Sequence, residues 1–240
     1  MKILPPRSAK TVDKAADKSS DKPPREPGAR SPALPKGKPH AKLPGEIRII
    51  GGQYKRTKLP VPNRPGLRPT PDRVRETLFN WLGQDLTGWR CADVFAGTGV
   101  LGFEAASRGA AEVLLCEQDA ALVTQLQTLK TRLKADAVRI ERGDGLSALR
   151  RLSAGSMQLV FLDPPFDSNL FEPALKAAAQ SLAPTGLVYL EAPKTWSNGD
   201  LQESGLQVHR SSKAGAVHFH LLVKAEAELH ASDEVHPAPD

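Results

Sequence analysis

From about residue 90 onward, short apolar runs alternate with longer stretches in which Ala and Leu recur at helical spacing. The apolar runs predict strands, because they are rich in Val, Leu and Ile and end at turn-forming residues. The predicted strands begin at Cys91, Glu112, Ala137, Met157 and Gly186. Such an alternation of strands and helices is typical of a parallel sheet with helices on both faces.

The last part of this region has a different pattern. The stretch LQVHRSSKAGAVHFHLLVK contains two strand-like runs joined by a short Lys-Ala-Gly turn, with no helix between them. Two strands joined in this way pair as an antiparallel hairpin. The predicted fold class is therefore α/β, with a doubly wound, mostly parallel sheet of seven strands that ends in an antiparallel hairpin.

A smaller element precedes the sheet. In IRIIGGQYKRTKLPV, apolar and basic residues alternate around Gly51 and Gly52, which predicts a β-hairpin with Lys and Arg on one face. The next segment, RPTPDRVRETLFNWLG, predicts a helix with Thr70 as its N-cap, Pro71 at its first position and Gly83 at its end.

These patterns divide the chain into four parts. Residues 1–45 hold 9 of the 21 prolines and 11 of the 33 Lys and Arg, with few large aliphatic residues, which predicts a disordered basic tail. Residues 46–85 form the hairpin and helix, and residues 86–225 form the α/β domain. Residues 226–240 are predicted to be a flexible C-terminal tail.

Charge is unevenly distributed along the chain. Residues 1–80 contain 19 Lys and Arg against 7 Asp and Glu, a net charge of +12, whereas the remaining residues contain 14 and 20, a net charge of −6. A basic N-terminal third on an acidic body favours a polyanionic partner such as nucleic acid. Cys91 and Cys116 lie in apolar runs without metal-ligand spacing, which favours a reduced, cytoplasmic protein without a metal site. No apolar run has the length of a membrane span or a signal peptide.

The first predicted strand leads into DVFAGTGVLG, where Gly97, Gly99 and Gly102 match the G-x-G-x-x-G pattern of nucleotide-binding loops. Glu117 ends the second strand, where a carboxylate accepts hydrogen bonds from ribose hydroxyls. Taken alone, this pattern fits a nicotinamide dinucleotide. Asp93, however, would repel a pyrophosphate and attract a cation, so S-adenosylmethionine is the favoured cofactor.

The fourth predicted strand ends in Asp163, followed by Pro164, Pro165 and Phe166. In a doubly wound sheet this strand end lies beside the loop of the first strand, at the edge where ligands bind. An ionised aspartate and two prolines offer acceptors and no donors, which favours an exocyclic amino group of a nucleobase, with Phe166 as a stacking surface. Holding both amino hydrogens directs the nitrogen lone pair toward a methyl donor. The alternative is a proline turn that ends a core strand.

The segments RIIGGQYKRTKLPVP, GLRPTPDRVRETLFNWL, DVFAGTGVLGFEAASRGA and FLDPPF resemble the RsmD family of bacterial methyltransferases, over about residues 46–224. The resemblance implies a Rossmann-like enzyme that transfers methyl from S-adenosylmethionine to the N2 amino group of a guanine in 16S ribosomal RNA. It assigns catalysis to Asp163, Pro164, Pro165 and Phe166. The expected cofactor contacts are Asp93, Ala96, Gly97, Thr98, Gly99, Glu117, Gln118, Asp144 and Gly145. An equal alternative for Asp144 is an ordinary helix N-cap.

By the same resemblance, the basic N-terminal element faces RNA. The expected contacts are Arg48, Arg56, Arg68, Thr70, Arg73 and Arg75. The expected partner is 16S ribosomal RNA or the assembling small subunit, bound by a monomer. Three alternatives stay open: an adenine-N6 methyltransferase acting on DNA or RNA, a nicotinamide-dependent oxidoreductase, and a non-catalytic RNA-binding assembly factor.

Overall fold

The computed structural model describes residues 45–64 and 67–225. The predicted tails therefore lie outside the described residues, apart from Gly45. The main sheet has seven strands in the order β5-β4-β3-β6-β7-β9-β8. The first five strands in this order run parallel, and β9 pairs antiparallel with both β7 and β8. The strands are β3 (Arg90–Asp93), β4 (Glu112–Glu117), β5 (Val138–Arg142), β6 (Met157–Leu162), β7 (Leu182–Ala192), β8 (Leu206–Ala214) and β9 (Val217–Lys224). The predicted fold class is confirmed.

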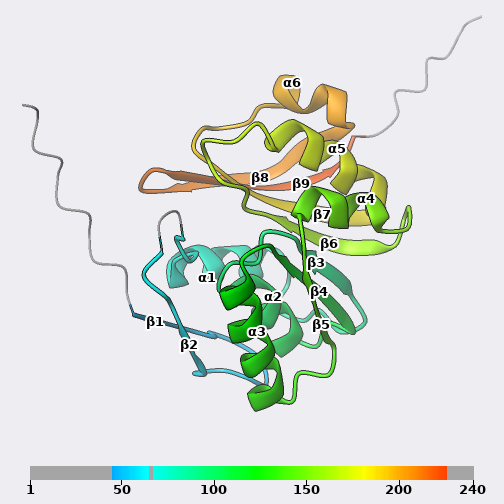
Figure 1. Ribbon diagram of the computed structural model, residues 1–240. Coiled ribbons are helices and arrows are strands. Elements are labelled where there is room, and N and C mark those ends of the chain that lie inside the picture. The colour runs from blue at the N-terminus through cyan, green and yellow to red at the C-terminus, as the bar shows by residue number, and fades with distance from the viewer. Residues whose placement is uncertain (1–44, 65–66, 226–240) are drawn as a thin grey trace, which may run out of the picture. The chain divides into compact units, whose positions relative to one another are not determined.

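Helices cover both faces of this sheet (Figure 1). They are α1 (Asp72–Trp81), α2 (Val100–Ser107), α3 (Ala120–Leu133), α4 (Gly145–Arg151), α5 (Phe171–Ser181) and α6 (Asn198–Leu201), with the 3₁₀ turn η1 (Gln202–Ser204) after α6. One hydrophobic cluster joins α1, α2 and α3 to the sheet, and a second joins α4, α5 and α6 to its other face. The central strands β3, β4, β6 and β7 contribute side chains to both clusters, because successive side chains on a strand point to opposite faces.

The strand order fixes where a ligand can bind. The chain runs from β3 outward to β5 and then returns to β6, which pairs with the other side of β3. In open α/β sheets the connections diverge at such a reversal and leave a crevice at the carboxyl ends of the strands. The carboxyl ends of β3 and β6 therefore mark the expected site.

The N-terminal element packs against this domain through a shared core. Strands β1 (Glu46–Arg48) and β2 (Lys58–Pro60) form a two-stranded antiparallel sheet, with Ile47 opposite Leu59. Both of these residues are buried in the cluster that contains α1 and α2. The predicted hairpin is present, but its connection spans residues 49–57 and is not a tight turn at Gly51 and Gly52.

Glu104 of α2 fastens the N-terminal element to the domain. Its side chain is fully buried and accepts hydrogen bonds from the backbone N–H groups of Ile50 and Gly51, at 2.9 and 2.8 Å. It also pairs with the guanidinium groups of Arg75, at 3.1 Å, and Arg108, at 2.8 Å. Arg75 is fully buried. This corrects the expectation that Arg75 contacts RNA, because an enclosed, paired guanidinium cannot reach a phosphate.

The start of α1 also differs from the prediction. Thr70 was expected to cap the helix, but the N-cap is Pro71, in an extended conformation, and no side chain caps the helix. Thr70 is buried, and its hydroxyl donates a hydrogen bond to Glu191 on β7 at 2.6 Å. The Thr70 hydroxyl therefore bonds to Glu191 and does not cap the helix. Because Thr70 is buried, it is also not exposed for the contact with RNA that was expected.

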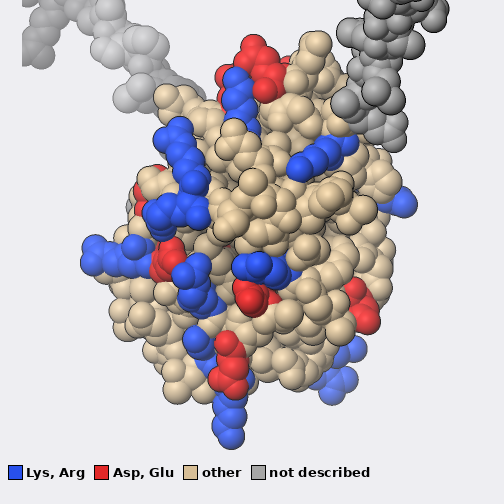
Figure 2. Space-filling model, turned by 90° about the vertical axis from the view of Figure 1, so that its right-hand side faces the viewer, with Lys and Arg blue, Asp and Glu red and all other residues tan. Residues whose placement is uncertain are grey.

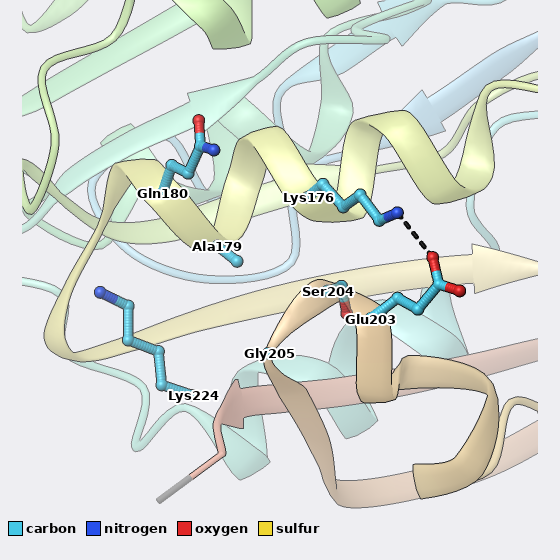
Figure 3. A pocket seen from close by; sticks show the side chains of 7 residues that line it. All are labelled: Lys176, Ala179, Gln180, Glu203, Ser204, Gly205 and Lys224. Carbon is cyan, nitrogen blue, oxygen red and sulfur yellow. Dashed lines mark hydrogen bonds and ion pairs between the residues drawn. The ribbon is translucent and has the colours of Figure 1, made fainter. Parts of the chain in front are cut away.

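A shallow pocket lies at the opposite edge of the sheet and is lined by residues of α5, η1 and β9 (Figure 3). Its two lysines already have partners: Lys176 pairs with Glu203 at 2.7 Å, and Lys224 donates to the carbonyl of Leu182, the first residue of β7. The pocket therefore opens at the amino end of the parallel strands, away from the crevice. None of the described helices has the length and apolar character needed to cross a membrane.

Candidate active site

Four acidic residues come together at the carboxyl ends of neighbouring strands. Asp93 ends β3, Glu117 ends β4, Asp163 directly follows β6, and Glu191 is the penultimate residue of β7. Since β4, β3, β6 and β7 are adjacent in the sheet, these acids lie along one edge. Within the described residues, no group of three or more His, Cys, Asp or Glu is arranged to hold a metal ion.

The glycine loop between β3 and α2 is folded back onto Glu117. The backbone N–H of Gly97 donates to Glu117 Oε2 at 2.8 Å, and the N–H of Asp119 donates to Glu117 Oε1 at 2.9 Å. Gly97 and Gly99 have φ values of 52° and 75°, which side chains rarely tolerate. A Cβ on Gly99 would also lie 2.4 Å from Leu126 Cδ2. The loop therefore requires glycine at this position, and Glu117 is fixed by two donors while each oxygen keeps acceptor capacity.

The other predicted cofactor residues surround this loop. Ala96 and Thr98 are buried within it, and Gln118 is exposed directly after Glu117. Asp144 caps α4, because its carboxylate accepts from the N–H of Ser147 at 2.8 Å. Gly145 packs so closely that an added Cβ would lie 2.2 Å from the carbonyl oxygen of Val94. The N-cap interpretation of Asp144 is thus confirmed, and a contact between Asp144 and adenine stays a prediction.

Asp93 lies beneath the glycine loop and is only 3% exposed. Its Oδ2 accepts one hydrogen bond, from the N–H of Gly102 at 3.1 Å. Burial raises the pKa of Asp93 to about 7, and the negative charges of Glu117 and Glu191 add to this effect. A buried carboxylate with one donor is costly when ionised, and a cation bound beside it would offset that cost.

We expect Asp93→Asn to stabilise the ligand-free protein above neutral pH. Because the pKa of Asp93 is raised from 3.8 to about 7, the folded protein holds a proton that the unfolded chain has lost. Stability therefore falls as pH rises from about 4 to about 7 and then levels off. An asparagine keeps an acceptor for Gly102 without the charge, so we expect a gain on the order of 2 kcal/mol at about pH 8 and less at about pH 6. Urea unfolding at both pH values measures this, and an Asn variant less stable than wild type at the higher pH would contradict it.

Asp163 begins the loop that follows β6. Its side chain is half-buried, and within residues 45–64 and 67–225 its carboxylate has no hydrogen-bond partner. Burial raises the pKa of Asp163 well above its ordinary value; the charges of Glu191 and Asp93 raise it further, and Arg68 opposes them. Pro164 is buried and Pro165 is exposed, with its carbonyl accepting from the N–H of Ser168 at 3.0 Å. Asp163 is therefore an acceptor without a partner at the edge of the crevice.

Glu191 was missed by the sequence reasoning. It is 4% exposed, and its Oε1 accepts hydrogen bonds from the hydroxyls of Thr70, at 2.6 Å, and Tyr189, at 2.9 Å. Burial raises the pKa of Glu191, and these two hydrogen bonds and Arg68 oppose the rise. The signal was available in the segment VYLEAP, because an acid ends this strand as Asp163 ends the one beside it.

The predicted RNA contacts differ in their surroundings. Arg68 and Arg73 are exposed at the start of α1, and the charge of Arg68 lowers the pKa of both Asp163 and Glu191, which places it beside the crevice. Arg48 and Arg56 are exposed on the N-terminal hairpin. Phe166, the predicted stacking surface, is partly exposed. Figure 2 shows basic side chains spread between acidic ones over one face of the molecule, so surface charge alone does not locate a nucleic-acid site there.

The chain is similar to known proteins over most of its described length. The model of the family described as "Conserved hypothetical protein 95" matches residues 47–223. Ribosomal RNA small subunit methyltransferase D of Escherichia coli strain K12 is 41% identical over 195 residues, which cover 77% of this chain and 93% of that protein. The enzyme of the same name from Haemophilus influenzae is 44% identical over 161 residues, which cover 65% of this chain and 82% of that protein.

Solved structures show the same likeness. A putative methyltransferase of Escherichia coli superposes with a TM-score of 0.64 at 38% identity and covers 76% of this chain and 100% of its own. A putative methylase of Haemophilus influenzae gives 0.62 at 33% identity, with the same coverage. A precorrin methyltransferase of Geobacter metallireducens, at 16% identity and a TM-score of 0.55, covers 69% of this chain and 93% of its own and shares the fold.

Proposed function

The chain belongs to the RsmD family, whose model spans nearly all of the described residues, and on this premise we propose that it methylates the exocyclic N2 amino group of a guanine in 16S ribosomal RNA. Its partner is the free RNA or the assembling small subunit, which it meets in the cytoplasm as a monomer. The observation that carries the proposal is the row of acidic side chains at the carboxyl edge of the sheet, with the unpartnered Asp163 beside the glycine loop.

The residues of the crevice fit S-adenosylmethionine as the methyl donor. This cofactor supplies an activated methyl group on a sulfonium cation. Asp93 brings a buried carboxyl group to the glycine loop, where a bound cation favours its ionised form and a pyrophosphate does not. Glu117, fixed by Gly97 and Asp119, presents carboxylate oxygens to ribose hydroxyls. The nicotinamide alternative gives Asp163, Pro164 and Pro165 no use.

The segment from Asp163 to Phe166 is suited to hold an amino group. The carboxylate of Asp163 and the carbonyl of Pro164 accept the two hydrogens of the guanine amino group, and the proline nitrogen has no hydrogen to compete. The lone pair of the amino nitrogen would then be directed toward the methyl group, whose bond to sulfur would break with both electrons on sulfur. The carboxylate of Asp163 would stabilise the positive charge that develops on the nitrogen and would accept the amino proton that is lost as the neutral product forms. Phe166 stacks on the face of the extruded base.

Arg68 and Arg73 are placed to position the RNA. Arg68 is exposed beside Asp163 and Glu191, and Arg73 is exposed on α1 near the end of β8. Arginine pairs well with phosphate oxygens. Such contacts fix the register of the RNA without reading its sequence. Base identity must therefore be read inside the crevice, where the extruded nucleotide meets the acidic side chains.

The product of the reaction tests the proposed function. We expect the full-length protein, S-adenosylmethionine and small subunits from cells that lack this protein to yield N2-methylguanosine, detected by mass spectrometry of the nucleosides. N6-methyladenosine as the product would favour the adenine methyltransferase instead. If no cofactor-dependent methyl transfer to subunits, free 16S RNA or DNA is detected, the result would favour a non-catalytic assembly factor and would overturn the proposal.

A further inference from the structure

Glu191 and Asp163 are neighbours at the carboxyl edge of the sheet. Leu162 of β6 pairs in register with Leu190 of β7, and each acid is the next residue along the chain. Adjacent parallel strands lie about 5 Å apart, so the two carboxyl groups face the same small volume. The charge of Glu191 raises the pKa of Asp163, which agrees with this placement.

Only one oxygen of the Glu191 carboxyl group is held by hydrogen bonds. Both the Thr70 and Tyr189 hydroxyls donate to Oε1, and Oε2 has no hydrogen-bond partner in the part of the chain that the structure describes. Tyr189 is itself immobilised, because it is fully buried and its ring meets Phe161 edge-on at 6.2 Å between centroids. Among the described residues, the enclosed side-chain polar atoms without a partner are Trp196 Nε1 and His220 Nδ1. Glu191 Oε2 is not one of them, so this oxygen is not fully enclosed and is available as an acceptor.

A purely structural role would not require a carboxylate at this position. A glutamine side chain has the same length, and its amide oxygen would accept the same two hydrogen bonds from Thr70 and Tyr189. The negative charge of Glu191 is costly here, because the residue is buried close to two other carboxylates. The second, negatively charged oxygen is therefore expected to serve a ligand.

The Watson–Crick edge of guanine matches this pair of acceptors. Guanine presents two donors side by side, the N1–H and the N2 amino group, whereas adenine presents an N6 amino group beside an N1 that carries a lone pair. Two adjacent carboxylates accept from both guanine donors, and they repel the lone pair on adenine N1. We propose that Glu191 is a specificity-determining residue, whose Oε2 accepts the N1–H of the target guanine while Asp163 and the Pro164 carbonyl hold its amino group. This inference rests on the proposed function and names how that site selects its base.

The test compares guanosine with 2-aminopurine riboside, which keeps the amino group but has an unprotonated N1. Small-subunit RNA is ligated to carry either base at the methylated position, once that position has been mapped, and is reconstituted into particles. Wild type is expected to methylate guanosine at least about 10²-fold faster in single turnover, because a site built to bind an N–H rejects an analogue that lacks it. Wild-type rates within about threefold of each other would overturn the inference, whatever any variant does.

The Glu191→Gln variant provides a second test, in which transfer rates to the two bases are compared again. Its amide oxygen satisfies Thr70 and Tyr189 and its NH₂ group faces the base, so we expect guanosine transfer to fall about 10²-fold and the preference for guanosine to be lost or reversed. A loss of equal size on both substrates would indicate a structural role and would contradict the inference. The matched control is Glu203→Gln, because Glu203 is an exposed glutamate at the opposite edge of the sheet. This variant should keep the wild-type preference for guanosine over 2-aminopurine riboside. If wild type yields no N2-methylguanosine at all, the proposed function fails first, so the two failures are distinguishable.

Discussion

Replacing Asp163 with alanine is expected to lower the single-turnover rate of methyl transfer by about 10²- to 10³-fold while cofactor affinity stays close to that of wild type. The carboxylate of Asp163 has no partner among the described residues, so its removal leaves no buried donor unsatisfied and the fold should persist. The interaction that is lost is strongest when the amino nitrogen becomes positively charged. It therefore contributes more to the transition state than to ground-state binding.

Asp163→Asn separates hydrogen bonding from charge. The amide oxygen keeps one acceptor for the amino group, but the negative charge is gone. Partial activity would mean that accepting the hydrogen bond matters most. Activity as low as that of Asp163→Ala would mean that the charge also stabilises the methylated nitrogen.

The matched control is Asp167→Ala, because Asp167 lies in the same loop and is exposed. Single-turnover transfer and calorimetric cofactor binding should be measured on the same preparations, with thermal unfolding as a check of folding. Transfer by a folded Asp163→Ala variant at near wild-type rate would show that the loop is only a turn and that the chemistry lies elsewhere.

The main strands of the fold could be predicted from local pattern, and their ends only approximately. Strands β4 and β6 begin at the predicted Glu112 and Met157, and β5 begins one residue after the predicted Ala137. Strand β7 begins at Leu182, four residues before the predicted Gly186, across a stretch that contains Pro184. Such a stretch reads locally as a turn. Leu182 instead pairs with Met157 across a register shift, a long-range contact that no local pattern contains.

The site was predicted less completely, for a related reason. Asp93, Glu117 and Asp163 were found because each ends a recognisable strand and follows or precedes a motif. Thr70 and Glu191 are 121 positions apart, and their hydrogen bond depends on how α1 packs against the sheet. Arg75 looks like one more surface arginine in a basic segment, and its burial becomes evident only when Glu104 is placed beside it. Partners of buried polar groups are a property of packing. Thr70 was therefore predicted at the helix cap and, with Arg75, at the RNA surface, and Glu191 was not predicted at all.

Glu104→Ala is expected to destabilise the protein by about 3 to 5 kcal/mol. Removing the carboxylate leaves the guanidinium of Arg75 fully buried and that of Arg108 nearly so, and it also leaves the N–H groups of Ile50 and Gly51 without their acceptor. Breaking a buried ion pair by removing one partner costs more than the pair itself contributes, because the remaining charge stays desolvated. Urea unfolding of the full-length protein measures the loss, and Glu203→Ala, which breaks an exposed pair with Lys176, should leave the unfolding midpoint unchanged.

A double-mutant cycle with Arg75→Met shows whether the ion pair carries this effect. If it does, Arg75→Met in the Glu104→Ala background should cost much less than it does alone. The reason is that the buried guanidinium, left with Asp72 as its remaining carboxylate partner, is then absent. The same chain of contacts reaches the site, since Arg75 Nε donates to the carbonyl of Thr70 at 3.1 Å and Thr70 holds Glu191. Under conditions in which the Glu104→Ala variant stays folded, its rate of methyl transfer should therefore be lower than that of wild type, with unchanged cofactor affinity. Unfolding midpoints within error of wild type for Glu104→Ala would contradict the assignment of Glu104 as the fastening of the N-terminal element.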